Sequence, residues 1–213
     1  MRLPRVYPIL DSESLDRCGV SIRAAAASFL EGGAQILQIR HKHHWTRAVY
    51  DDARAVARLC REAGAELIVN DRADFALLLD AGLHVGQDDL APRDVRKILG
   101  SSATVGYSNH NVAQLSAAGG EPVDYVAFGP IFGTASKQNP DPTVGVEELR
   151  RVRDLVEKPL VAIGGITLSN ALDVLRAGAD SLAIIAGLIP ASATAQSLRQ
   201  RMEEWVKLTA ATS

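Results

Sequence analysis

Residues 38–45, QIRHKHHW, place a dense group of nitrogen-bearing side chains directly after the apolar segment GGAQIL. That segment has β character, so a strand is predicted to run straight into the group. Arg40 and Lys42 are two residues apart, and side chains two apart on a strand point to the same side, which suits a grip on an anion. His41 points to the other side. The three histidines of the stretch leave a zinc site or a solvated turn open as alternatives.

Polar or small residues also follow further apolar runs along the chain. They are Asn70 and Asp71; His84, Gln87, Asp88 and Asp89; Ser108, Asn109 and His110; Thr134, Ser136 and Lys137; Gly164 and Gly165; and Ala186 and Gly187. Taken singly, the aspartates suit helix N-caps and the glycine pairs suit tight turns. Their joint occurrence after successive apolar runs favours a common site.

The charged members of this set indicate one chemistry. Two acidic residues at adjacent strand ends, Asp71 and one of the pair Asp88–Asp89, have amide side chains nearby and offer the oxygen ligands that Mg²⁺ prefers. Arg40, Lys42 and Lys137 add positive charge, and cations beside a Mg²⁺ site indicate a pyrophosphate.

The glycine-containing turns indicate a second ligand. Gly165 and the pair Ala186–Gly187 each open onto a predicted helix, where backbone N–H groups can bind a single phosphate. The residues alone therefore predict an enzyme that handles a diphosphate with Mg²⁺ and a second phosphorylated molecule.

These residues can meet only if the carboxyl ends of the strands lie together. Strands are predicted at residues 6–10, 35–39, 66–70, 83–86, 104–108, 125–129, 159–165 and 181–187, and the clearest helices at 21–33, 46–64, 168–180 and 192–208. Strands too apolar to face water, alternating with helices, predict a parallel sheet. Eight such units are the number that closes a barrel. The predicted fold class is therefore α/β, a single (β/α)8 TIM barrel over residues 1–213, with an open doubly wound sheet as the alternative.

The composition bounds the class of protein. The chain has 213 residues, of which 47% are hydrophobic and 23% charged, as expected for a globular protein with a sizeable core. A net charge of −2 argues against a broad nucleic-acid-binding face. Cys18 and Cys60 lack a CxxC spacing and are expected to be reduced thiols. No signal peptide or membrane-spanning run is found, so we expect a cytoplasmic protein without a membrane partner.

Taken together and in order, QIRHK, VNDR, HVGQDD, GYSNH, GPIFGTASK and VAIGGI resemble the motifs of the thiamine-phosphate synthase family, also called thiamine-phosphate pyrophosphorylase. The resemblance extends from RVYPILD to SLAIIAG. It implies a Mg²⁺-dependent transferase of thiamine biosynthesis. Such an enzyme joins hydroxymethylpyrimidine diphosphate to a thiazole phosphate, or to its carboxylated form with loss of CO₂. The products are thiamine phosphate and pyrophosphate.

The resemblance also implies a role for each matching residue. Gln38, Arg40, His41 and Lys42 belong to the strand that binds the pyrimidine diphosphate, Asn70 contacts the diphosphate, and His84 lies near the pyrimidine. Asp71 and Asp89 match the Mg²⁺ ligands. Thr134 and Ser136 meet the thiazole, and Gly165, Ile185 and Ala186 line its phosphate. Arg40, Ser108 and Lys137 are the expected catalytic residues, with Ser108 between the reacting centres.

Three positions depart from the family pattern: His41 stands where an acidic residue is common, Ser136 where Thr is usual, and Ala186 where Ser is common. Two alternatives stay open, a thiazole tautomerase-like enzyme with the same barrel and a non-catalytic sensor of a thiamine-pathway phosphate. A homo-oligomer and a mobile lid over residues 133–144 are further expectations.

Overall fold

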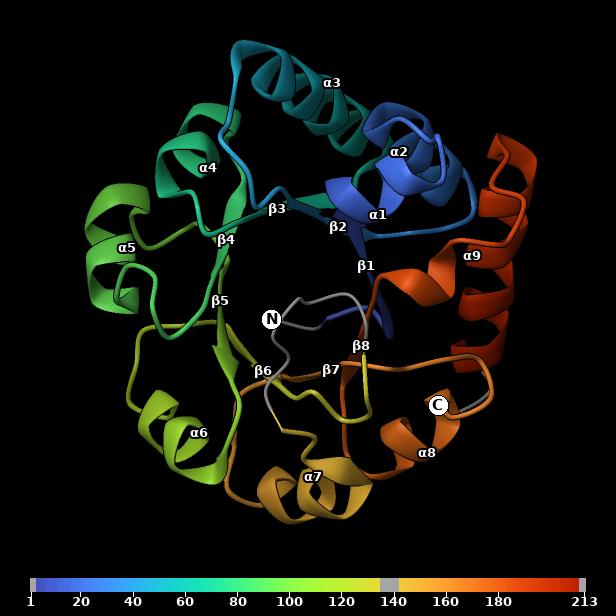
Figure 1. Cartoon of the computed structure of the whole chain (residues 1–213). Coiled ribbons are helices and arrows are strands. Elements are labelled where there is room, and N and C mark those ends of the chain that lie inside the picture. Colours follow the sequence, from blue (N-terminus) through green and yellow to red (C-terminus); the bar gives the residue numbers. More distant parts are fainter. Residues whose placement is uncertain (1–2, 135–141, 211–213) are drawn as a thin grey trace.

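The computed structural model describes residues 3–134 and 142–210 (Figure 1). Eight parallel strands close into one barrel in chain order. The strands are β1 (Val6–Asp11), β2 (Ile36–Arg40), β3 (Glu66–Asn70), β4 (Gly82–Val85), β5 (Val105–Asn109), β6 (Tyr125–Phe128), β7 (Leu160–Ile163) and β8 (Ser181–Ile184). Closure is direct, because β1 pairs with β8 in a register that sets Val6 opposite Leu182.

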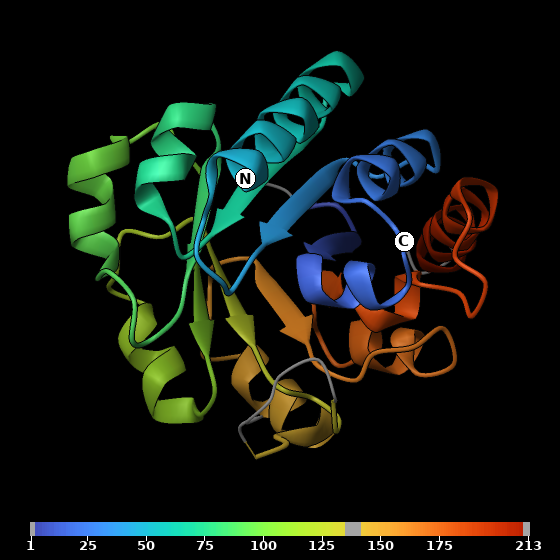
Figure 2. The same cartoon turned by 45° about the horizontal axis from the view of Figure 1, so that its top comes forward.

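Helices surround the strands on the outside (Figures 1 and 2). They are α1 (Ser12–Arg17), α2 (Ile22–Glu31), α3 (Arg47–Ala63), α4 (Ala73–Leu79), α5 (Pro92–Leu99), α6 (Val112–Ala118), α7 (Gly145–Arg153), α8 (Ala171–Arg176) and α9 (Ala195–Ala210), with a short 3₁₀ helix η1 (Ala186–Leu188). Within the described residues, no helix is long and apolar enough to cross a membrane.

The predicted barrel is confirmed, and the open-sheet alternative is wrong because both edges of the sheet are paired. All eight predicted strands are present, but β7 and β8 end earlier than expected. After β7, Gly164 and Gly165 take φ values of +100° and +62°, outside the extended region. After β8, the chain turns into η1. The short helix α1, which the sequence did not indicate, begins directly at the end of β1.

Helix α3 shows how local sequence sets the elements. It begins after Thr46, whose Oγ1 accepts a hydrogen bond from the Val49 N–H at 3.3 Å. It ends at Gly64, which has the left-handed φ of +66° that glycine adopts without strain. This is the end predicted from the sequence.

A separate apolar cluster fills the inside of the barrel below its mouth. Its members are Leu3, Tyr7, Ile9, Ile36, Ile68, Tyr125, Ala127, Val161 and Ala183. The ring of Tyr125 fits there because Gly106 has no side chain: a Cβ at Gly106 would lie 2.0 Å from Tyr125 Cζ. This packed layer is the floor beneath the residues described next.

Candidate active site

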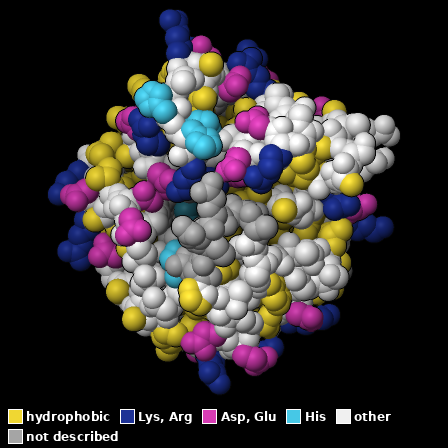
Figure 3. Space-filling model, viewed as in Figure 1, with side chains coloured by type: hydrophobic (Ala, Val, Ile, Leu, Met, Phe, Trp, Pro, Cys, Tyr) yellow, Lys and Arg dark blue, Asp and Glu magenta, His cyan; other side chains and the backbone are white. Residues whose placement is uncertain are grey.

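A cavity of about 310 Å³ opens at the carboxyl ends of the strands. On this face of the molecule, histidines and charged side chains of both signs lie around the barrel mouth (Figure 3). Twelve of the predicted site residues line the cavity: Gln38, Arg40, Lys42, Asn70, Asp71, His84, Asp89, Ser108, Thr134, Gly165, Ile185 and Ala186. Ser136, Lys137 and most of the expected lid at 133–144 lie outside the described residues.

Asp71 and Asp89 lie close together at the rim, after β3 and β4. Burial raises the pKa of Asp71 above its ordinary value of 3.8, Lys42 opposes this shift, and Asp89 adds to it. Asp71 has a φ of +66°, a conformation uncommon for residues other than glycine but tolerated by Asp and Asn. Asp89 Oδ2 accepts a hydrogen bond from the Gly86 N–H at 2.7 Å. Two neighbouring carboxylates repel each other, and a hard cation between them would remove that repulsion.

Asn70 supplies an uncommitted donor beside this pair. Asn70 lines the cavity and is only 6% exposed. Among the residues that the structure describes, its buried Nδ2 has no hydrogen-bond partner. An unpaired buried N–H is costly, so this atom suits the oxygen of an anionic ligand.

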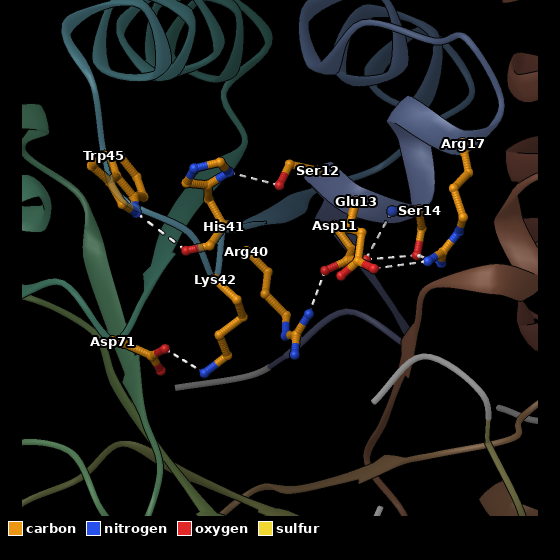
Figure 4. A network of polar contacts seen from close by, with 10 residues as sticks. All are labelled: Asp11, Ser12, Glu13, Ser14, Arg17, Arg40, His41, Lys42, Trp45 and Asp71. Carbon is orange, nitrogen blue, oxygen red and sulfur yellow. Dashed lines mark hydrogen bonds and ion pairs between the residues drawn. The ribbon is translucent and has the colours of Figure 1, made fainter. Parts of the chain in front are cut away.

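Two cations face the cavity from the end of β2 (Figure 4). Lys42 Nζ contacts Asp71 Oδ2 at 2.5 Å. Arg40, whose side chain is 13% exposed, forms an ion pair with Asp11. Asp11 is buried and is itself held at the start of α1, where its Oδ2 accepts hydrogen bonds from the Ser14 N–H at 3.1 Å and the Ser14 Oγ–H at 2.6 Å. The ion pair with Asp11 therefore holds one side of the Arg40 guanidinium in place.

The structure does not bring His41 to the cavity. Figure 4 shows it on the side of β2 opposite Arg40 and Lys42, as strand alternation requires. Its Nδ1 lies 2.7 Å from Ser12 Oγ, and its ring meets Trp45 edge to face at 5.9 Å. The expected substrate contact of His41 is thus not supported.

The zinc alternative for this stretch finds no support either. His43 and His44 are exposed. Over residues 3–134 and 142–210, no group of three or more His, Cys, Asp or Glu side chains is placed to hold a metal ion. The neighbouring carboxylates of Asp71 and Asp89 instead suit Mg²⁺, which completes its coordination with water and ligand phosphates.

A chain of hydrogen bonds crosses the floor of the cavity. Gln38 Nε2 donates to Tyr7 Oη at 3.0 Å, Tyr7 Oη lies 2.8 Å from Tyr125 Oη, and Tyr125 Oη lies 3.0 Å from His84 Nδ1. His84 Nε2 then lies 2.8 Å from Ser108 Oγ. The chain links residues of β1, β2, β4, β5 and β6.

Glycine turns shape the opposite end of the cavity. Gly165 packs so closely that a Cβ there would lie 2.5 Å from the Gly133 carbonyl oxygen. Gly187, which follows Ala186 in η1, accepts a hydrogen bond from Trp205 Nε1 of α9 at 3.1 Å. These turns leave backbone groups, without bulky side chains, beside Ile185 and Ala186 on the cavity wall.

Sequence reasoning missed three residues of the site: Asp11, Tyr7 and Tyr125. Each lies at an inward position of its strand, two residues or a multiple of two from an inward neighbour such as Ile9 or Ala127. Inward polar residues of apolar strands were the available signal.

A barrel of eight parallel strands with its cavity at their carboxyl ends is the architecture of a TIM-barrel enzyme. Comparison with known proteins narrows this class. Residues 6–188 match the family model described as thiamine monophosphate synthase, and the chain belongs to that family.

Individual relatives are similar to this protein over nearly the whole chain. The chain is 43% identical to the thiamine-phosphate synthase of Koribacter versatilis, over 98% of this chain and 97% of the relative. It is 41% identical to that of Chloroflexus aurantiacus, over 92% and 90%. The solved thiamine phosphate pyrophosphorylase from Pyrococcus furiosus superposes with a TM-score of 0.84 at 30% identity, covering 97% of this chain and 96% of that one.

Proposed function

We propose that this chain joins hydroxymethylpyrimidine diphosphate to a thiazole phosphate, with Mg²⁺, to form thiamine phosphate and pyrophosphate. One observation carries the proposal: two adjacent carboxylates, Asp71 and Asp89, lie with Lys42 and the unpaired Nδ2 of Asn70 on one cavity rim. A metal-bound diphosphate satisfies all four at once, since it supplies positive charge to the carboxylates and oxygens to the donors.

The proposed reaction needs no nucleophilic side chain. The bond between the pyrimidine methylene carbon and the diphosphate oxygen breaks, and its electron pair leaves with pyrophosphate. The pyrimidine amino group stabilises the resulting methylene cation. The thiazole nitrogen then donates its lone pair to that carbon and forms the new C–N bond. Rate enhancement comes from positioning and from positive charge placed where the leaving group becomes negative.

Individual residues take roles that follow from their places. Asp71 and Asp89 would hold Mg²⁺, which supplies charge neutralisation to the diphosphate when bound. Arg40 and Lys42 would bind the diphosphate oxygens, with Arg40 pre-oriented by Asp11. A role for Lys137 at the leaving group rests on the family resemblance, because this residue lies outside those described.

The two ends of the cavity suit the two substrates. Gln38, His84 and Ser108 lie on the floor near the carboxylate rim and would contact the pyrimidine. Gly165 and Ala186 would bind the thiazole phosphate through backbone N–H groups, which explains why Ala in place of Ser at 186 is tolerable. Thr134 and Ser136 would meet the thiazole ring. A tautomerase-like enzyme has no use for a diphosphate clamp, and no observation favours it.

The experiment is a product assay on the purified full chain. With both substrates and Mg²⁺, we expect pyrophosphate and thiamine phosphate in equal amounts, and neither product when one substrate is omitted. EDTA should abolish turnover, and excess Mg²⁺ should restore it. Absence of pyrophosphate release with both substrates present would refute the proposal and leave a binding function instead.

A further inference from the structure

We propose that Tyr7 and Tyr125 are positioning residues whose buried hydroxyls set the tautomer of His84. They hold its imidazole with the proton on Nε2, so that His84 donates to Ser108 and the Ser108 hydroxyl hydrogen is turned toward the cavity. The effect on turnover rests on the proposed function, whereas the tautomer itself does not.

Packing places the two phenols rigidly. Tyr7 is 1% exposed and Tyr125 is fully buried. Their rings meet edge to face at 5.9 Å, and the Tyr125 ring stacks on the His84 imidazole at 5.6 Å with an interplanar angle of 20°. The space for the Tyr125 ring exists because Gly106 lacks a Cβ. Burial also raises the pKa of both phenols, so both stay protonated and each has one hydrogen to donate.

The direction of the chain begins at Gln38. Its Nε2 is a donor only, so the Tyr7 oxygen accepts that hydrogen bond. The Tyr7 hydrogen must then find an acceptor, because a buried hydroxyl without one is costly. The Tyr125 oxygen, 2.8 Å away, is the acceptor that the contact provides.

The same reasoning continues to His84. With its oxygen accepting from Tyr7, Tyr125 donates its own hydrogen to His84 Nδ1 at 3.0 Å. A ring nitrogen that accepts carries no proton, so the neutral imidazole carries it on Nε2. Nε2–H then donates to Ser108 Oγ at 2.8 Å. The Ser108 hydroxyl hydrogen is left for a group inside the cavity, which Ser108 lines.

The first test reads the tautomer directly. Nitrogen-15 NMR of the full chain, labelled at its five histidines, distinguishes a protonated from an unprotonated ring nitrogen, and loss of a signal in His84→Gln assigns His84. We expect a protonated Nε2 and an unprotonated Nδ1. A protonated Nδ1 with Nε2 as acceptor would mean that the hydrogen bonds from Gln38 to Ser108 point in the opposite direction, and it would overturn the proposal.

Variants separate positioning from mere packing. Tyr125→Phe keeps the ring and removes the donor to Nδ1, so the His84 signals should lose their single-tautomer pattern. Tyr7→Phe leaves that donor in place and should disturb the tautomer less. Tyr50→Phe is the control, since it removes a phenol hydroxyl on α3 that is not part of the cavity lining. An unchanged His84 tautomer in Tyr125→Phe would refute the positioning role of Tyr125. If that variant fails to fold, the NMR spectrum of the unmodified protein still tests the proposal.

Kinetics supply the second readout. Tyr125→Phe should lower kcat about 10- to 100-fold, the scale for losing a group that orients a functional side chain. KM for the thiazole phosphate should be unchanged, because that end of the cavity is untouched. A rise confined to that KM would contradict the inference. If the unmodified chain released no pyrophosphate, the proposed function would fail while the NMR result would still judge the tautomer.

Discussion

Replacing Asp71 by Asn tests the metal site with little disturbance of the fold. Asn has nearly the same size and tolerates the left-handed backbone at φ +66°. The change removes one carboxylate charge and leaves the amide oxygen. Its expected signature is a protein that is folded and stable but has lost its response to Mg²⁺.

The expected stability change is small. The variant loses the ion pair with Lys42, whose side chain is 47% exposed against 20% for Asp71, and such a pair contributes about 0.2–1 kcal/mol. It gains relief from the repulsion of Asp89, which acts in the opposite direction. The free energy of unfolding without metal should therefore change by less than about 1 kcal/mol.

The response to ligand should differ much more. A complex of Mg²⁺ and pyrophosphate at 100 times its Kd stabilises the folded state by about 2.7 kcal/mol. In a chain of this length each kcal/mol raises Tm by about 2–4 °C, so we expect a rise of roughly 5–11 °C in the unmodified protein. In Asp71→Asn the rise should largely vanish, and kcat should fall about 100- to 1,000-fold, as on removal of one strong electrostatic contact.

Thermal unfolding with and without Mg²⁺ and pyrophosphate measures the first effect, and steady-state turnover measures the second. Asp74→Asn is the matched control: it removes a carboxylate paired with Arg72 on nearby α4, outside the residues that line the cavity. It should leave both responses intact. An Asp71→Asn protein with the full Tm rise and an unchanged Mg²⁺ dependence would refute the metal assignment.

Three further outcomes are expected. Asp11→Ala should lower the free energy of unfolding by about 3 kcal/mol in urea denaturation, because it leaves the Arg40 charge unpaired. Asp11→Asn should recover about 1 kcal/mol of this loss, because it keeps the N-cap of α1. Equal losses in the two variants would contradict the capping role of Asp11. Gly165→Ala puts a Cβ 2.5 Å from a carbonyl oxygen at φ +62°, and should raise KM for the thiazole phosphate without changing that for the pyrimidine diphosphate. Because Mg²⁺ needs a deprotonated Asp71 whose pKa is raised, the Mg²⁺ activation constant should begin to rise at a pH above 3.8 on acidification. Without metal, the stability that protonated Asp71 contributes is complete below pH 3.8 and is lost as the pH rises through the raised pKa of Asp71. Mg²⁺ titrations and thermal melts over a pH series measure the two effects, and Asp71→Asn should show neither the rise in the activation constant nor the change in stability.

Much of the fold was predictable because its signals are local. Each strand of a parallel barrel is buried on both faces and must therefore be a short apolar run, and each helix between them shows its own spacing and caps, as α3 does with Thr46 and Gly64. The predicted ends were less accurate for β7 and β8: backbone dihedrals at Gly164 and Gly165 end β7, and the turn into η1 ends β8. Glycine permits that conformation but does not require it, so the sequence cannot place the end.

The candidate site was likewise predictable in part from the sequence. Its gathering at the strand ends follows from topology, so residue types and order alone predicted Arg40, Lys42, Asp71 and the pair Asp88–Asp89 as a group, and the family resemblance indicated Asp89. The separation of His41 from Arg40 also followed from the two-residue period of a strand.

Only the tertiary structure decided which side chains are paired. Asp11 meets Arg40 across 29 positions, and Tyr7 meets Tyr125 across 118. Such contacts depend on barrel register and on the room that Gly106 leaves for a ring, and neither quantity is carried by a local pattern. The sequence by itself determined the strands, their order and the chemistry gathered at their ends. Three-dimensional packing determined how buried donors, acceptors and charges satisfy one another, because that requirement acts through space and not along the chain.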